Sequence, residues 1–282
     1  MLSYIHAYHA GNHADILKHI TVSLILSYLC KKEKPFTIFD THSGSGIYSF
    51  SDERLRKTDE AEDGIKRFLA RLSEYELSNE HEEERKLIAP YIEIVRAYAL
   101  KNLYPGSPAI ENNFVRPDKD IQILSEFHPT VINELKENAR NFNSKPQIHF
   151  RDGYEMLKAL TPPEIKRGFC LIDPSYEDKK DYDDCIKAIT EVHKKWSVGI
   201  IALWYPLLTH NEGEVTNLID RIEFLAESTQ SNFLNIRLEV KEPEEFSGLA
   251  ALYGSGMVIV NPPYTLASDM EKIIPFIKKT IL

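Results

Sequence analysis

The sequence predicts an α/β protein in which a mainly parallel sheet is covered by helices on both faces. Apolar, strand-like runs alternate with stretches of helical periodicity along most of the 282 residues. The first run leads into a glycine turn, Asp40 to Gly46, and an acidic residue ends or follows each of the next three runs: Glu126, Asp152 and Asp173. Together these features favour a Rossmann-like fold with a ligand crevice at the carboxyl ends of the strands.

The first predicted element is a helix that begins after Asn12, a good N-cap, with Asp15 in its first turn. Its apolar residues recur at steps of three and four, and two lysines and a proline end it: Leu17, Ile20, Leu24 and Tyr28, then Lys31, Lys32 and Pro35. Seven strands are predicted after it, at residues 36–40, 121–126, 147–150, 169–172, 198–204, 234–240 and 256–260.

Residues 51–103 break this alternation, because they show helical spacing and no strand-like run. Their 13 acids slightly outnumber their 10 bases, so they do not form a simple basic clamp. We therefore expect residues 1–50 and 104–282 to form the Rossmann-like domain and residues 51–103 to form an inserted helical subdomain.

Composition excludes several classes of protein. The net charge of −9 argues against a protein that coats nucleic acid non-specifically, although it allows a local basic site. The N-terminus lacks the basic start and apolar stretch of a signal peptide, and no apolar run is long enough to cross a bilayer. The three cysteines lack metal-ligand spacing and are expected to be reduced. These features predict a cytoplasmic protein.

Three strand ends carry residues suited to a nucleoside ligand. The glycine turn has the spacing G-x-G without a third glycine, so a tight structural turn is an alternative interpretation. Glu126 stands where an acid of this fold class binds ribose hydroxyls, and Asp152-Gly153 is placed to reach an adenine ring. An acid of this kind is, taken alone, more often a solvated strand end, but the order of these acids at successive strands favours a joint site.

The fourth predicted strand, Phe169 to Ile172, leads directly into Asp173-Pro174-Ser175-Tyr176. This run differs by one residue from the Asp-Pro-Pro-Tyr tetrad of methyltransferases that act on exocyclic amines. Such an amine is a poor nucleophile, since its lone pair is delocalised into the ring. A carboxylate, a main-chain carbonyl and a stacking aromatic can hold it and aim the lone pair at a methyl donor. Asp173, the carbonyl of Pro174 or Ser175, and the Tyr176 ring are predicted to do this, with the Pro174 carbonyl as the preferred acceptor.

A second tetrad, Asn261-Pro262-Pro263-Tyr264, follows the last strand and matches that consensus more closely. The last strand of such a sheet lies away from the expected crevice, so this tetrad is predicted to be a rigid exit from the strand. The N-terminal histidines His6, His9, His13 and His19 lack the acid or cysteine that would complete a zinc site. They are expected to form polar lids near the site or to be buried with satisfied nitrogens.

Several runs together resemble the bacterial 23S rRNA (adenine-N6)-methyltransferase J family over essentially the whole chain. They are Leu2 to His6, His9 to Asp15, Leu17 to His19, Asp40 to His42, Tyr104 to Pro108, Ala202 to Pro206 and Ser255 to Pro263. The resemblance implies an S-adenosylmethionine-dependent methyltransferase that needs no metal and modifies N6 of one adenine in 23S rRNA, before or early in subunit assembly.

The resemblance also implies roles for individual residues. Asp173 would be the catalytic acceptor, Tyr4 would contact the RNA, and His6 and Tyr176 are expected to add to that contact. The cofactor site would be lined by Lys18, His19, His42, Ser107, Glu126, Asp152, Gly153 and Asp173.

Ser175 departs from the family pattern, which has a second proline there. The carbonyl acceptor survives this change but the rigidity of Pro-Pro is lost. A DNA adenine methyltransferase, a methyltransferase of protein or small-molecule amines, and a non-catalytic nucleic-acid-binding module linked to the use of external DNA remain as alternatives. The sequence leaves open the exact adenine and the oligomeric state.

Overall fold

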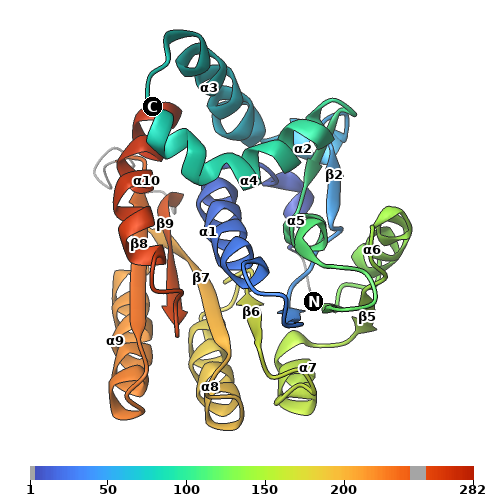
Figure 1. Ribbon diagram of the computed structural model, residues 1–282, viewed down its shortest axis with the longest axis vertical. Coiled ribbons are helices and arrows are strands. Elements are labelled where there is room, and N and C mark those ends of the chain that lie inside the picture. The colour runs from blue at the N-terminus through green and yellow to red at the C-terminus, as the bar shows by residue number, and fades with distance from the viewer. Residues whose placement is uncertain (1–3, 242–251) are drawn as a thin grey trace.

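One mixed sheet forms the centre of the computed structural model, which describes residues 4–241 and 252–282 (Figure 1). Its strands are β1 (Thr37–Asp40), β4 (Ile121–Glu126), β5 (Gln147–Phe150), β6 (Gly168–Ile172), β7 (Ile200–Leu208), β8 (Phe233–Glu239) and β9 (Leu252–Val260). Leu2 and Ser3, which contribute to the family resemblance, lie outside the described residues.

The strand order in the sheet is β5-β4-β1-β6-β7-β9-β8. The first five of these run parallel to their neighbours, whereas β9 runs antiparallel to both β7 and β8. This is the Rossmann order with one additional antiparallel strand placed before the last. The order of connection reverses between β1 and β6, where this fold class opens its ligand crevice. The predicted α/β, Rossmann-like methyltransferase fold is confirmed.

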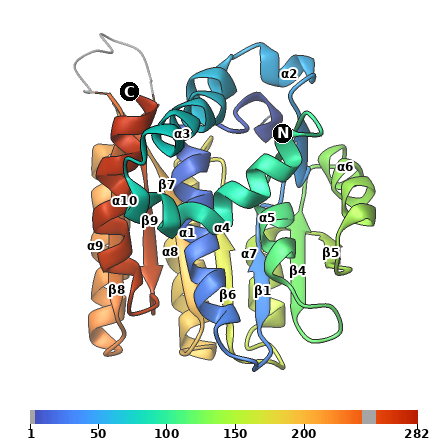
Figure 2. The same cartoon turned by 45° about the horizontal axis from the view of Figure 1, so that its top comes forward.

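Helices cover both faces of the sheet (Figure 2). One face carries α1 (His13–Cys30), α5 (Ser107–Phe114) and α10 (Leu266–Ile281); the other carries α7 (Gly153–Leu160), α8 (Lys180–Lys195) and α9 (Glu212–Ser228). Successive strand residues alternate between two cores, because Ile38 packs with α1 while Phe39 packs with Trp196 and α8. Helix α6 (Val131–Asn138) and a 3-10 turn, Ala139–Asn141, precede β5.

Between residues 53 and 99 the regular secondary structure is entirely helical, as the sequence predicts. These residues form α2 (Glu53–Arg56), a π-helical turn (Glu62–Lys66), α3 (Arg67–Ser78) and α4 (Glu82–Ala99). Two short antiparallel strands that the sequence did not predict, β2 (Ile47–Ser49) and β3 (Leu103–Pro105), flank them. Phe68 and Tyr91 share one hydrophobic core with α1 and α10. The boundary of a separate subdomain at 51–103 stays a prediction.

The last strand is longer than predicted, because it begins at Leu252 rather than at residue 256. Gly254 and Gly256 weaken the strand signal in the sequence. Gly256 nevertheless suits its place, since a Cβ there would lie 2.1 Å from the ring of Tyr205 on β7. Similarly, β7 continues to Leu208, beyond the predicted residue 204, because it pairs with β9 along this extension.

Candidate active site

A cavity of about 540 Å³ lies at the carboxyl ends of the parallel strands, beneath the N-terminal segment. The parallel direction of β1, β4, β5 and β6 brings their ends to this one edge of the sheet, which we call the upper edge. The sequence-predicted residues that line the cavity are Tyr4, His6, Lys18, His19, His42, Ser107, Glu126, Asp152, Gly153, Asp173 and Pro174.

The glycine turn after β1 forms one wall of this cavity. Gly44 adopts a positive φ of 57°, and its amide donates to Oε2 of Glu126 at 2.9 Å. The other oxygen, Oε1, accepts from the His128 amide at 2.7 Å. Burial raises the pKa of Glu126. The carboxylate is thus held rigidly at the end of β4, with lone pairs left for a hydroxyl donor in the cavity.

Asp152 serves as the N-cap of α7. Its Oδ1 accepts from the amides of Tyr154 at 2.9 Å and Glu155 at 3.0 Å. Gly153 permits a close approach, because a Cβ there would lie 2.2 Å from the Thr41 carbonyl oxygen. This pair therefore has a structural role as well as a place in the cavity wall.

His42 and Ser107 complete the wall around β1. Burial lowers the pKa of His42, so the ring is neutral near pH 7, and its Nδ1 lies 2.7 Å from Oγ1 of Thr41. Ser107 donates to Oδ2 of Asp40 at 2.7 Å. Burial raises the pKa of Asp40 to about 7. In the sequence Asp40 stands out only as the start of the glycine turn.

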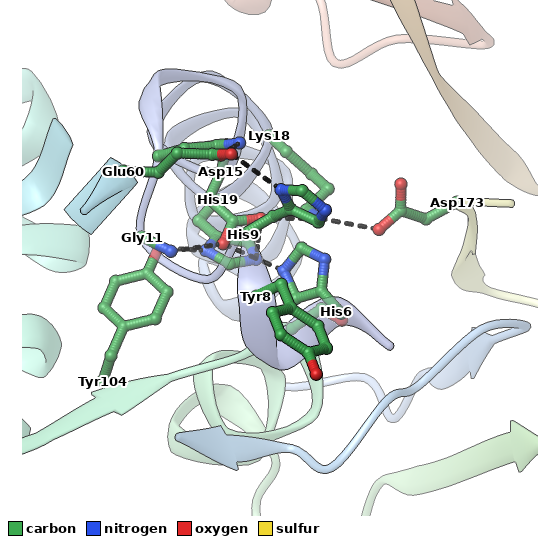
Figure 3. Close-up of polar contacts among 12 residues, drawn as sticks. His6, Tyr8, His9, Gly11, Asp15, Lys18, His19, Glu60, Tyr104 and Asp173 are labelled. Carbon is green, nitrogen blue, oxygen red and sulfur yellow. Dashed lines mark hydrogen bonds and ion pairs between the residues drawn. The ribbon is translucent and has the colours of Figure 1, made fainter. Parts of the chain in front are cut away.

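A buried ion network connects α1 to the end of β6 (Figure 3). Nζ of Lys18 lies 2.6 Å from Oδ2 of Asp173 and 2.8 Å from Oδ1 of Asp15. Oδ2 of Asp15 accepts from the Gly11 amide at 2.8 Å and lies 3.1 Å from Nε2 of His6. One lysine ammonium therefore joins two carboxylates from segments far apart in the sequence.

Electrostatic attraction outweighs burial in this network. Burial alone would raise the pKa of Asp15, but His6 and Lys18 together hold it well below its ordinary value. Burial alone would lower the pKa of Lys18, but Asp15 and Asp173 raise it above its ordinary value. Both groups are charged near neutral pH. Asp15 was predicted only to lie in the first turn of its helix, although its spacing of three residues from Lys18 places both on one helix face.

The remaining N-terminal side chains close the cavity from above. The Tyr4 hydroxyl lies 2.9 Å from Nδ1 of His6, and the Tyr4 ring stacks on His9 at 5.8 Å. Glu60, which the sequence analysis did not single out, lies 2.8 Å from Nδ1 of His9 and accepts from Asn12 at 2.9 Å. His19 is buried; burial lowers its pKa to about 3, and its Nδ1 lies 2.9 Å from the Tyr104 hydroxyl.

The prediction that a substrate base stacks on Tyr176 is wrong for this structure. The Tyr176 ring is only 6% exposed, lies 4.6 Å from the Tyr182 ring and is absent from the cavity lining. Its hydroxyl donates to the Trp204 carbonyl at 2.7 Å. The physical reason is the backbone, because Tyr176 adopts a left-handed φ of 53° that turns its side chain into the core. Trp204, on the next strand, lines the cavity instead.

The second tetrad lies at the opposite edge of the sheet, because β9 is antiparallel to β7. Nδ2 of Asn261 donates to the carbonyls of Ser197 at 2.8 Å and Gly199 at 3.0 Å. Pro262 and Pro263 line a separate, smaller pocket. The interpretation of this tetrad as a rigid strand exit agrees with these contacts.

Within residues 4–241 and 252–282, no group of three or more His, Cys, Asp or Glu side chains is placed to hold a metal ion. In the same residues no helix is long and apolar enough to cross a membrane. All three cysteines are free.

Comparison with known proteins gives consistent results. The family model described as "Ribosomal RNA large subunit methyltransferase D, RlmJ" matches residues 33–282. Proteins named ribosomal RNA large subunit methyltransferase J from Haemophilus influenzae and Escherichia coli K12 are 38% and 36% identical; each alignment covers 100% of this chain and 95% of the relative. A crystal structure of a Legionella pneumophila protein, 33% identical, superposes with a TM-score of 0.84 over 97% of this chain and 94% of that one.

Proposed function

This chain belongs to the ribosomal RNA large subunit methyltransferase J family, and we propose that it methylates the N6 amino group of one adenine in 23S rRNA with S-adenosylmethionine as donor. The observation that carries this proposal is Asp173, which a buried lysine holds at the end of β6 in one cavity with the glycine turn, Glu126 and Asp152.

The cavity suits a nucleoside cofactor. Its volume lies in the range of small-molecule sites, and Gly44 gives a ligand close access to the backbone of the β1 turn. Glu126 would accept from the ribose hydroxyls, and Oδ2 of Asp152 would accept from the adenine amino group, since only its Oδ1 is used in capping α7. When bound, S-adenosylmethionine supplies an electrophilic methyl group on a sulfonium. His42, neutral and half-buried, adds no positive charge beside it.

Asp173 would orient the amine. Lys18 occupies its Oδ2, and among the described residues no hydrogen bond uses its Oδ1. That oxygen can accept one N–H of the substrate, and the Pro174 carbonyl can accept the other, so the nitrogen lone pair points towards the methyl donor. After transfer the nitrogen is acidic, and its proton passes to Asp173 or to water.

Trp204 takes the stacking role that the sequence assigned to Tyr176. In the β6–β7 register Ile172 lies beside Leu203, so Asp173 and Trp204 follow at neighbouring strand positions. Trp204 lines the cavity, and Nζ of Lys18 lies 5.9 Å from its ring. An adenine held by Asp173 would therefore meet an indole face.

The proposed substrate is naked rRNA or an early assembly intermediate. Extrusion of an adenine from folded RNA costs a few kcal/mol, and the RNA contacts of the N-terminal segment, which carries Tyr4 and His6, must offset this cost. A target inside a finished subunit would be less accessible. Action on rRNA also agrees with the cytoplasmic location expected from the sequence.

Transfer of tritiated methyl groups to total RNA from a strain that lacks this gene tests the proposal. We expect one labelled adenine in 23S rRNA, mapped by nuclease digestion and mass spectrometry, and no label with Asp173→Asn. Matched RNA and DNA oligonucleotides that carry the mapped site separate rRNA from DNA methylation. Label on DNA alone, or on protein alone, would refute the assignment.

A further inference from the structure

The second tetrad forms part of a pocket at the lower edge of the sheet, where the parallel strands begin. Its volume is about 220 Å³, and it is lined by Tyr28, Leu29, Lys32, Arg167, Gly168, Val198, Ile200, Asn261, Pro262 and Pro263. Figure 2 shows the α1–β1 connection and the start of α10 at this end, opposite the N-terminus. Gly168 starts β6 and Asp173 follows its end, so roughly 16 Å of strand separates the two cavities.

One aromatic side chain beside this pocket is highly exposed. Tyr264 is 83% exposed, and its ring meets that of Tyr28 edge to face at 5.9 Å. Val198 is 64% exposed on the same rim. Two prolines and the double hydrogen bond of Asn261 fix the backbone just before Tyr264. The ring is therefore presented to solvent from a rigid turn.

The same edge is basic, although the whole chain carries a net charge of −9. Arg116 and Lys119 pair there with Asp120 and Glu33. No ion pair among the described residues involves the other basic side chains of this edge: Lys31, Lys32, Lys34, Lys166 and Arg167. Nζ of Lys31 lies 5.9 Å from the Tyr28 ring centroid, so charge and aromatic surface adjoin.

We propose that this lower-edge patch, made of Tyr28, Lys31, Lys32, Tyr264 and the Pro262-Pro263 turn, binds a single-stranded segment of the RNA substrate away from the target adenine. Interleaved lysines and exposed aromatic rings suit phosphates and stacked bases. An acidic protein partner would also match the charge, and the kinetic test below separates it from RNA. The inference rests on the proposed function, because the RNA it binds is the methyl acceptor.

Methylation kinetics with a 23S rRNA transcript test this proposal. We expect Tyr264→Ala, and separately the double variant Lys31→Glu/Lys32→Glu, to raise KM for the transcript about tenfold. The kcat and the affinity for S-adenosylmethionine should stay within about twofold. The double variant should also make the affinity less sensitive to salt: the negative slope of log affinity against log salt concentration should become smaller in magnitude by about 1 to 2. Tyr264→Phe keeps the ring and should behave like the unchanged protein.

Two matched controls lie elsewhere on the surface. Lys278→Glu reverses an exposed charge at the other end of α10, and Phe224→Ala removes a ring that is 71% exposed on α9; neither should change KM. Thermal unfolding checks that each variant is folded, and the rescue by Tyr264→Phe separates loss of the ring from misfolding.

The outcomes separate the two proposals. If the unchanged protein methylates the transcript but KM and the salt slope are the same in both patch variants, the RNA patch is refuted and a protein partner becomes the better occupant. If no RNA is methylated at all, the proposed function fails. In that case direct binding of a fluorescent single-stranded RNA still decides the patch, because Tyr264→Ala must weaken it about tenfold.

Discussion

Two tetrads that share their second-position proline and final tyrosine follow strands of the same sheet, yet they lie at opposite edges. Asp173-Pro174-Ser175-Tyr176 follows β6, which is parallel to β1, and reaches the large cavity. Asn261-Pro262-Pro263-Tyr264 follows β9, which is antiparallel to β7, and reaches the small basic pocket. The direction of the strand, rather than the closeness of the match, decides which tetrad can meet a ligand bound at the glycine turn.

The chemical surroundings differ as much as the positions. At the upper edge Asp173 is a carboxylate with 13% side-chain exposure, and its ion-pair partner among the described residues is the buried Lys18. At the lower edge the amide of Asn261 is used up in two hydrogen bonds to the backbone. The first side chain keeps a free acceptor oxygen, and the second has both N–H groups committed to holding the turn.

The largest effect should follow from Asp173→Asn. The substitution keeps shape but removes the negative charge, so the amine loses its charged acceptor and Lys18 loses a partner. We expect kcat to fall by at least about 10³-fold, equivalent to about 4 kcal/mol of transition-state stabilisation. Single-turnover methyl transfer measures this. A rate within tenfold of the unchanged protein would mean that the wrong tetrad carries the chemistry.

Lys18→Met should cause the next largest effect. It leaves Asp15 and Asp173 buried without their shared cation, and breaking a buried ion pair from one side costs about 3 kcal/mol. Urea unfolding near pH 7 should show this loss. The double variant Asp15→Asn/Lys18→Met removes one of the two carboxylates left without a cation, so it should be more stable than Lys18→Met alone. A loss below about 1 kcal/mol in the single variant would contradict the ion network.

At the lower edge, Asn261→Ala should cost about 2 kcal/mol of stability and leave kcat unchanged. The variant loses two hydrogen bonds and places alanine at a φ of 57°. Asn261→Gly loses the same bonds without the backbone strain, so it should be less destabilised by about 1 kcal/mol. Paired urea and methylation measurements test both effects. A large loss of kcat in either variant would mean that the Asn261 tetrad, rather than the Asp173 tetrad, carries the chemistry.

The fold could be predicted because each central strand is a short apolar run bounded by turn residues. Glu126, Asp152 and Asp173 could be grouped for the same reason, since parallel strands bring their ends to one edge. The strands β2 and β3 were missed because each is only three residues long, too short to show a period.

Two parts of the site could not be predicted from local patterns. The contact of Lys18 with Asp173 joins positions 155 residues apart, and only the packing of α1 against the sheet brings them together. The direction of the Tyr176 ring depends on a left-handed backbone conformation. Glycine or asparagine commonly indicates this conformation in a sequence, but tyrosine does not. A tetrad therefore predicts the place of its first residue better than the orientation of its last.

Ser175→Pro makes the upper tetrad more like the lower one. Among the described residues no hydrogen bond uses the Ser175 amide, and its hydroxyl accepts from the Glu177 amide at 3.4 Å. The added ring should stiffen the turn without removing the Pro174 carbonyl, so the rate should change by less than about tenfold. Single-turnover kinetics with unchanged cofactor affinity test this. A larger loss would assign the Ser175 hydroxyl a direct contact with the base.

The smallest expected effect is a pH dependence of stability that arises at the upper edge. His9 lines the upper cavity, whereas no histidine is among the residues that line the lower pocket. The hydrogen bond to Glu60 raises the pKa of His9 above its ordinary 6.5, against burial and with help from Asp15. The pair therefore stabilises the fold fully below pH 6.5 and loses its effect as the pH rises through the raised pKa. With side chains 39% and 33% exposed, solvent screening limits the effect to under about 1 kcal/mol. The free energy of unfolding of the unchanged protein and of His9→Gln, measured from pH 6 to 9, should differ by an amount that shrinks as the pH rises. A difference that grows with pH would contradict the pair. In a Glu60→Gln background this pH dependence should disappear.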